Sequence, residues 1–412
     1  MSQSIFSPLT LPNGIEIPNR IAKAAMEENM AIDGHLPGDD IFKLYQTWAN
    51  GGAGLLITGN VMVDHRAMTG PGGISLEAAT ALEPFKQWAS VAKQNNTQVW
   101  MQLNHPGRQV YAAMGGTVLS PSDVALDMGK HSNLFGQPTP MTEIDIKELI
   151  ERFVVSASRA IEAGFDGVQI HAAHGYLLSQ FLSPLTNQRT DQWGGSLENR
   201  ARLLYEIIKA VQQALPKTAT IAVKLNSADF QRGGFDSQDA LQVVEQLEAL
   251  KVDLVELSGG SYESPAMQGV TSDGRTLERE AYFLTFAKQI AQKTGMPIMT
   301  TGGITRLAIA NQVVEQGVDM VGMGRALAFS PTLPKQWQHD PQAQATLPNV
   351  MWKNKTMASM ATMAIAKRQL QRIGRGKQPK LNSSALFSLI ADRVRLSKLT
   401  KKYRQRYATT PA

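Results

Sequence analysis

Eight short apolar segments alternate with amphipathic helical patterns along most of this chain, and this alternation restricts the possible folds more than any other feature. Each apolar segment has the length and composition of a strand buried on both faces. Eight strand–helix units predict an α/β fold, the (β/α)8 TIM barrel. A doubly wound sheet is disfavoured by the count of eight and by the lack of a Gly-x-Gly-x-x-Gly turn after the first strand. The predicted strands are 21–26, 55–58, 98–103, 167–170, 220–225, 254–258, 297–301 and 320–323, and the predicted helices are 39–50, 84–95, 144–163, 197–214, 238–250, 281–294 and 306–316.

Segments outside this repeat lie at both ends of the chain. Residues 6–17 predict an N-terminal β-hairpin around Pro12-Asn13-Gly14, which we expect to cap the barrel. Helical patterns at 357–370 and 383–407 predict a helical C-terminal extension, with Met360, Met363 and Ile365 available to pack. We therefore expect a barrel over residues 1–338 and an extension over 339–412, which packs on the barrel or on a neighbouring subunit.

The extension is strongly basic. After residue 340 the chain has 15 Lys and Arg and one acidic residue, so the whole-chain totals of 41 and 35 leave 26 basic and 34 acidic residues for 1–340. Residues 341–412 are thus net +14 and residues 1–340 net −8. Such a tail can bind nucleic acid or an anionic membrane. Apolar residues such as Trp352 and Phe387 are mixed through it, which favours packing against protein.

The composition excludes several kinds of chemistry. The chain has no Cys, which rules out disulfides, a thiolate nucleophile, Cys-ligated zinc and a Cys-held iron–sulfur cluster. Redox work therefore needs a bound organic cofactor, or a metal held by His and carboxylates. No apolar run reaches the roughly 18 residues that cross a membrane. The N-terminus lacks a basic region followed by an apolar one, so we expect a cytoplasmic protein.

Three polar rings follow the fourth predicted strand at once: His171, His174 and Tyr176. Barrel active sites lie at the carboxyl ends of the strands, and polar or Gly residues follow the other predicted strands as well. His and Tyr donate or shuttle protons, so these three are candidate catalytic residues. The two His could instead ligate a metal or be satisfied by backbone groups in the core. No motif provides a third ligand, and we assign no metal site.

Glycine-rich turns follow the seventh and eighth predicted strands. They contain Gly302-Gly303 and Gly324-Arg325. Glycines let backbone N–H groups approach an anion, and Arg325 adds a charged donor. The alternative is that these glycines serve only to form tight turns. In these barrels the corresponding loops commonly bind phosphate. A phosphate beside proton donors suggests a phosphorylated cofactor over the barrel mouth, and FMN fits.

Over residues 4–338 the sequence resembles the old yellow enzyme family of FMN-dependent oxidoreductases. The resemblance depends on five motifs in combination. They are Asn19-Arg20-Ile21, Gln102-Leu103-x-His105-x-Gly107-Arg108, His171-x-x-His174-x-Tyr176, Asp191-x-Trp193-Gly194-Gly195-Ser196-x-Glu198-Asn199-Arg200 and Gly324-Arg325. Without Cys and at this length, the chain is similar to the single-barrel ene-reductases rather than to members with an iron–sulfur cluster.

The resemblance implies a role for each matching position. His171 and His174 would bind a substrate carbonyl or nitro oxygen, and Tyr176 would donate the proton. Glu27, Lys224 and Asn29 differ from the residues usual in the family: Glu27 would lie beside the flavin, Lys224 near its N1/O2 edge, and Asn29 beside the substrate. The remaining residues expected to bind non-covalent FMN are Ala24, Ala25, Met26, Asn60, Gln102, Gly302, Gly303, Gly324 and Arg325.

The implied activity is reduction of an electron-poor alkene or nitro compound, with NADH or NADPH as reductant. Oxidative demethylation of a small amine, in the same family, is an alternative that aromatic side chains around a cation would favour. A flavin-binding protein that associates with nucleic acid through its basic tail is an alternative of another class. Some relatives extend a C-terminal segment onto a neighbouring subunit, so we expect a homo-oligomer.

Overall fold

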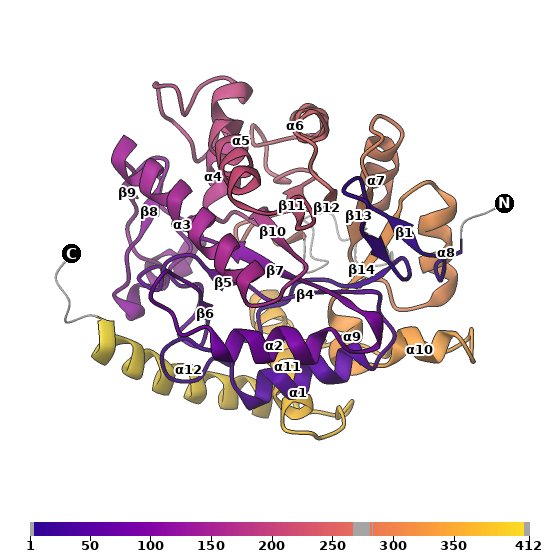
Figure 1. The fold of residues 1–412 in the computed structure, drawn as a ribbon. Coiled ribbons are helices and arrows are strands. Elements are labelled where there is room, and N and C mark those ends of the chain that lie inside the picture. Colours follow the sequence, from indigo (N-terminus) through magenta and orange to yellow (C-terminus); the bar gives the residue numbers. More distant parts are fainter. Residues whose placement is uncertain (1–3, 267–280, 282, 408–412) are drawn as a thin grey trace.

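A closed barrel of eight parallel strands forms the centre of the computed structural model, which describes residues 4–266, 281 and 283–407 (Figure 1). Hydrogen bonding between β7 and β10, with Gly167 opposite Trp100, closes the ring. The predicted TIM barrel is therefore confirmed. In order around the barrel, the strands are β3 (Ile21–Lys23), β4 (Leu55–Ile57), β7 (Gln98–Asn104), β10 (Gly167–Ala172), β11 (Thr220–Asn226), β12 (Leu254–Ser258), β13 (Ile298–Thr301) and β14 (Met320–Met323).

Helices cover the outside of the strands. The longer helices bury one apolar side, as α3 does with Ile146, Leu149 and Phe153, and Thr142 starts α3 with a capping box to Asp145. The predicted helices are found within a few residues, except that the helix expected at 281–294 is shorter; residue 282 lies outside the described residues. The helices are α1 (Asp39–Ala49), α2 (Glu83–Ala92), α3 (Glu143–Glu162), α4 (Leu177–Leu182), α5 (Leu197–Ala214), α6 (Ser237–Ala249), α7 (Leu284–Ala291), α8 (Leu307–Glu315), α9 (Arg325–Phe329) and α10 (Leu333–Trp337).

The N-terminal hairpin closes one end of the barrel. Its strands, β1 (Leu9–Thr10) and β2 (Glu16–Ile17), pair antiparallel as predicted. Leu9, Leu11 and Ile17 are buried in one cluster with residues of the barrel interior, among them Trp100. The hairpin thus covers the amino ends of the strands and leaves the carboxyl ends available for a site.

The long connection after β7 forms short elements over the carboxyl end of the barrel. The sheet is extended there by β5 (Val61–Met62) and β6 (Ile74–Ser75), which follow β4 in the chain. The connection itself contains η2 (Ala112–Met114), β8 (Leu119–Ser120), η3 (Gly129–Leu134) and β9 (Thr139–Pro140), of which β8 and β9 pair in parallel.

Two helices form the extension, α11 (Lys355–Gly374) and α12 (Ala385–Tyr407). α11 packs on α1, and α12 packs on α11 and reaches η2 (Figure 1). Ile365 is buried as expected, but Met360 and Met363 are exposed. Small residues take their place: Ala361 and Ala364 pack against Leu389 and allow the two helices a close approach. Within the described residues, no helix is long and apolar enough to span a membrane.

Candidate active site

His171, His174 and Tyr176 come together at the carboxyl end of β10. The ring centroids of His171 and His174 are 5.0 Å apart, and those of His171 and Tyr176 are also 5.0 Å apart. His174 has a left-handed backbone, with φ of 62°, and Asn226 on the next strand accepts its amide N–H at 3.0 Å. A left-handed residue reverses the chain, so all three rings project from one turn.

Both histidines are neutral. Burial lowers the pKa of His171 and of His174 well below the usual value, and the positive charge of Lys224 adds to the effect. The Nδ1 atom of His171 accepts the amide N–H of Ala173 at 3.2 Å, so its proton lies on Nε2. The Nε2 atom of His174 lies 2.8 Å from the Ser258 hydroxyl. The pair can donate N–H groups to an oxygen atom without carrying positive charge.

The Tyr176 hydroxyl is buried and hydrogen-bonded. It lies 3.1 Å from the Tyr262 hydroxyl and also bonds with Asn60. Burial and the charge of Glu27 raise the pKa of Tyr176. A tyrosine that keeps its proton at neutral pH is suited to donate it. Asn60, which we expected to contact a flavin, therefore also contacts the candidate proton donor.

A chain of polar side chains crosses the barrel beneath these rings. The Gln102 amide donates to Gln169 at 2.7 Å, and Gln169 donates to the Glu256 carboxylate at 2.8 Å. Glu256 also forms a 2.7 Å ion pair with Lys224 and accepts the Thr301 hydroxyl at 2.7 Å. These contacts fix the predicted Gln102 and Lys224 in place, because every link is buried or half-buried and hydrogen-bonded.

The glycine turns after β13 and β14 fit a bound phosphate. Gly302 and Gly303 have φ of 153° and 69°, which side chains rarely allow. Among the described residues, no backbone carbonyl accepts the amide N–H of Gly303 or Gly324. A Cβ on Gly322 would lie 1.9 Å from the Thr301 hydroxyl, so β13 and β14 approach closely just before these turns. Free N–H groups at adjacent turns, with Arg325 beside them, form a donor set suited to an anion.

The segment after β3 contains the remaining predicted flavin contacts. Ala24 continues the ladder by donating its N–H to Met323, so Ala24, Ala25 and Met26 run along the mouth beside the β14 turn. Glu27 accepts a hydrogen bond from Thr69 at 2.9 Å. Asn29 has φ of 55°, and its side chain accepts the amide N–H of Gly72 at 2.7 Å. Its contact with substrate stays a prediction.

The C-terminal extension reaches this mouth. Arg395 of α12 donates to the backbone carbonyl of Asn29 at 2.6 Å, and Tyr403 donates to the carbonyl of His65 at 2.8 Å. Tyr407 stacks on His35, with centroids 5.2 Å apart. α12 therefore contacts the loops that follow β3 and β5 of its own chain and holds them in place.

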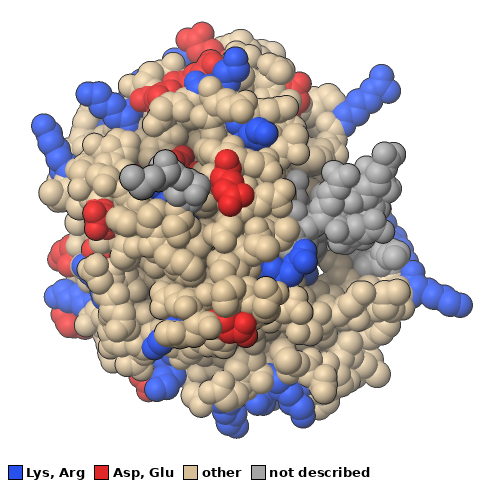
Figure 2. Space-filling view, turned by 90° about the vertical axis from the view of Figure 1, so that its right-hand side faces the viewer, with Lys and Arg blue, Asp and Glu red and all other residues tan. Residues whose placement is uncertain are grey.

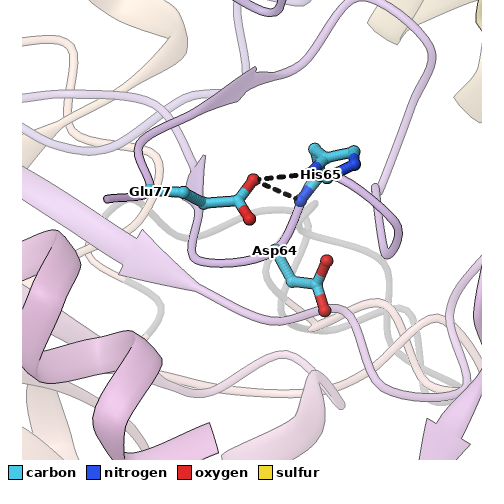
Figure 3. Close-up of side chains that lie close together, drawn as sticks. All are labelled: Asp64, His65 and Glu77. Carbon is cyan, nitrogen blue, oxygen red and sulfur yellow. Dashed lines mark hydrogen bonds and ion pairs between the residues drawn. The ribbon is translucent and has the colours of Figure 1, made fainter. Parts of the chain in front are cut away.

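Asp64, His65 and Glu77 form a cluster beside α12 (Figure 3). In the figure the Glu77 carboxylate faces His65, whose Nδ1 lies 2.8 Å away. Arg66 binds the Asp64 carboxylate through two nitrogens, and Arg152 lies 3.2 Å from Glu77. Burial opposes ionisation of Asp64, but the hydrogen bonds from Arg66 together with the charges of His105 and Arg152 outweigh it and lower the pKa of Asp64 to about 2. We interpret the cluster as a structural network of ion pairs.

Several residues of the site escaped the sequence analysis. Glu256 and Lys23 could have been noticed, because each is a charged residue inside an apolar strand. Tyr262 and Tyr111 could not, since loop tyrosines carry no periodic signal. Tyr111 stacks on Phe135 with centroids 4.9 Å apart, and Phe135 lies 6.0 Å from Tyr262. A row of rings thus leads from the surface to Tyr176.

Comparison with known proteins agrees with this geometry. The chain is 36% identical over 352 residues to the NADH-dependent flavin oxidoreductase iliE of Hypocrea jecorina, covering 80% of this chain and 87% of that protein. It is 32% identical over 343 residues to the NADPH dehydrogenase of Bacillus pumilus, covering 81% and 94%. The fold matches the old yellow enzyme homologue from Zymomonas mobilis, with a TM-score of 0.71, 23% identity and coverage of 84% and 95%.

The family profile covers most of the barrel and extends slightly past it. It matches residues 4–344, close to the 4–338 over which the motifs occur. The resemblance inferred from those motifs is confirmed, and the chain belongs to the NADH:flavin oxidoreductase / NADH oxidase family, whose cofactor is FMN.

Proposed function

We propose that this protein uses NADH or NADPH to reduce an electron-poor C=C bond conjugated to a carbonyl or nitro group. One observation carries the proposal: at the end of β10, the His171 ring lies 5.0 Å, between ring centroids, from a second neutral histidine, His174, and 5.0 Å from a protonated tyrosine, Tyr176. Reduction of such a bond needs a site for the oxygen that gains negative charge and a separate proton donor. The two histidines and Tyr176 would meet both needs.

FMN would be held by the residues already described around the mouth. The amide groups of Gly303 and Gly324 and the side chain of Arg325 would bind its phosphate, and Ala24 to Met26, Gln102 and Lys224 would surround its ring. When bound, FMN supplies the redox chemistry by taking a hydride from the nicotinamide and delivering it to the substrate carbon β to the carbonyl or nitro group.

The chain's own residues then act on the substrate. The His171 Nε2–H and the His174 ring would donate hydrogen bonds to the substrate oxygen as it becomes negative. Neutral donors suit this task, since an imidazolium would protonate the oxygen. The Tyr176 hydroxyl would give its proton to the α carbon, which completes the saturated product. Asn60 and Tyr262 hold that hydroxyl and would stabilise the phenolate that remains.

Oxidative demethylation of an amine is a second candidate. The row of Tyr111, Phe135 and Tyr262 leads to Tyr176, and burial, with a smaller contribution from the charge of Glu27, raises the pKa of all three tyrosines. Aromatic faces near a carboxylate attract cations. The first function is favoured because this second reaction has no use for a pair of neutral donors beside a protonated tyrosine.

The test is anaerobic reduction of the FMN-loaded protein with NADH or NADPH, followed by cyclohexenone or a nitroalkene. We expect bleaching by the nicotinamide and return of colour with the alkene. Tyr176→Phe should slow the second step by about 10²-fold or more and leave the first unchanged. Tyr205→Phe, remote on α5, is the matched control. Bleaching of the oxidised protein by a methylated amine, with no return of colour when alkenes are added to the reduced protein, would support demethylation instead.

A further inference from the structure

Arg108 is the last residue of one of the sequence motifs, but it is neither a flavin contact nor a group of the proposed reaction. Charged side chains usually project into solvent, as Lys and Arg do on the face shown in Figure 2. The Arg108 side chain is only 4% exposed, and its guanidinium lies 2.6 Å from the carboxylate of Glu263, which is 12% exposed. Because burial of two charges costs free energy, the pair is explained better by what it holds in place than by stability.

The Arg108–Glu263 ion pair joins the loop after β12 to the long connection after β7. The Nη1 atom of Arg108 donates to the carbonyls of Val124 and Ala125, at 3.2 and 2.8 Å. The other carboxylate oxygen of Glu263 accepts the amide N–H of Asp127 at 2.8 Å. Both members of the pair thus bind the same stretch of the connection. The loop after β12 cannot shift at Glu263 without breaking two charge-assisted hydrogen bonds.

The backbone of Arg108 is tied to the turn that carries Tyr176. Gln180 of α4 accepts the amide N–H of Arg108 at 3.2 Å and donates to the carbonyl of Gly175 at 2.7 Å. A Cβ on Gly175 would lie 2.8 Å from the Cβ of Ser261, so the loop after β12 also packs directly on this turn. The loop after β12 and the Tyr176 turn are therefore both fixed relative to Arg108.

Tyr262 immediately precedes Glu263 in the chain, and its hydroxyl reaches Tyr176. The two hydroxyl oxygens are 3.1 Å apart, and the ring centroids are 6.0 Å apart. This contact is the one hydrogen bond of the Tyr262 hydroxyl within the described part of the chain. The Tyr262 ring also lies 6.0 Å from Phe135, which belongs to the connection that Arg108 binds. The position of the hydroxyl therefore depends on the backbone beside it, which Glu263 fixes.

A hydrogen bond from Tyr262 matters most when Tyr176 loses its proton. Burial raises the pKa of both hydroxyls, so both are protonated in the resting site and either can donate to the other. Once Tyr176 gives its proton to the α carbon, its oxygen is negative and Tyr262 must be the donor. Hydrogen bonds to a charged group are roughly twice as strong as neutral ones, so this contact would stabilise the transition state more than the resting state.

We propose that the Arg108–Glu263 ion pair positions Tyr262 so that its hydroxyl donates to the Tyr176 oxygen as the proton leaves. This inference rests on the alkene reduction proposed above. Arg108 and Glu263 are positioning residues, because each acts through Tyr262. Asn60, the other partner of the Tyr176 hydroxyl, comes from a different loop, after β4. Loss of the pair should therefore slow the proton transfer and not abolish it.

The kinetic test is a double-mutant cycle on the FMN-loaded protein, with the nicotinamide and alkene half-reactions measured separately. Tyr262→Phe should lower the limiting rate of reoxidation by cyclohexenone about tenfold to a hundredfold, without weakening alkene binding or slowing reduction by the nicotinamide. Glu263→Gln should give most of that loss. The two substitutions together should be no slower than Tyr262→Phe alone, because the pair acts through Tyr262.

Two further variants keep the cycle interpretable. Glu263→Gln leaves a buried guanidinium without a counter-charge, so Arg108→Met combined with Glu263→Gln replaces it if circular dichroism or flavin content shows a loss of fold. Asp239→Asn is the matched control, because it breaks a half-buried pair with Arg200, 3.0 Å long, between α5 and α6. It should leave both half-reactions unchanged.

A second readout does not require any reaction. In NMR spectra of the resting, FMN-loaded protein with isotope-labelled tyrosine rings, Tyr176→Phe and Tyr262→Phe identify the two signals by their loss. Glu263→Gln should shift both signals, and Asp239→Asn should shift neither. These shifts report whether the ion pair holds the two hydroxyls together.

Three results would overturn the proposal. The first is a wild-type rate of the alkene step in Tyr262→Phe or in Glu263→Gln. The second is a combined variant whose loss is the product of the two single losses, because the pair would then act on something other than Tyr262. The third is a pair of tyrosine signals that Glu263→Gln leaves in place. A wild-type protein that no alkene reoxidises would instead refute the proposed function, and the NMR shifts would still decide whether the pair positions Tyr262.

Discussion

Lys23 lies inside the first barrel strand without contact to water, and its removal gives the sharpest test of how this barrel is held together. Its side chain is 0% exposed, and its Nζ donates to the Ile57 carbonyl at 2.8 Å and to the Tyr45 hydroxyl at 3.2 Å. The Glu28 carboxylate, 4% exposed, lies 3.6 Å from Nζ. Burial lowers the pKa of Lys23 to about 8, although Glu28 opposes the shift.

Replacement of Lys23 by Met keeps the volume and removes the charge. Glu28 would keep its hydrogen bonds from Tyr45 at 2.5 Å and from the Gly59 amide at 3.1 Å, but it would become a buried carboxylate without a counter-charge. Breaking a buried pair in this way costs about 3–5 kcal/mol. Removal of both charges often costs little. The free energy of unfolding of the double variant, Lys23→Met with Glu28→Gln, should therefore lie within about 1 kcal/mol of the wild-type value.

The assay is urea unfolding of the FMN-saturated protein, followed by circular dichroism, for wild type, both single variants and the double variant. Lys86→Met is the matched control: its pair with Glu83 is shorter, at 2.7 Å, but exposed, and no measurable loss is expected. The reasoning is that this ion pair matters for stability because it is buried, not because its atoms are close. A decrease in unfolding free energy below about 1 kcal/mol for Lys23→Met, or no recovery of that free energy in the double variant, would refute it.

Three further predictions follow from other parts of the mouth. Burial lowers the pKa of His105 to about 4, below the unfolded value near 6.5, so the folded state binds fewer protons in this window and stability should fall as pH drops from about 6.5 to 4. His105→Gln should flatten that slope in denaturation midpoints, and an equal slope would contradict it. Arg395→Met removes the bond to the Asn29 carbonyl and should speed amide exchange in residues 29–36, with Arg393→Met as an exposed control on the same helix. Exchange equal to the control would show that α12 does not brace the loop. Glu27→Thr should raise the flavin midpoint potential in a dye-coupled titration, because a negative charge near the ring opposes electron arrival, and an unchanged potential would contradict this.

The sequence by itself determined the barrel and the identity of its chemical groups. Eight apolar segments between amphipathic helices identify buried parallel strands, because periodicity is a local property of the chain. Since barrel sites lie at the carboxyl ends of strands, the residues after each segment could be named from the sequence: His171, His174 and Tyr176 after one strand, and the glycine turns after two others. Their functional roles stay predictions.

Only the tertiary structure decided which of these groups touch and what supports them. Glu256 joins Lys224 to Gln169 across neighbouring strands, and Arg395 reaches Asn29 from 366 positions along the chain. Nothing in the local pattern encodes such pairs, because their formation depends on how the strands stagger and where the extension packs. The same reason explains Met360 and Met363: an apolar residue on a helix predicts burial somewhere, but which face is covered depends on the neighbouring surface, and here α11 turns its alanines inward and its methionines out.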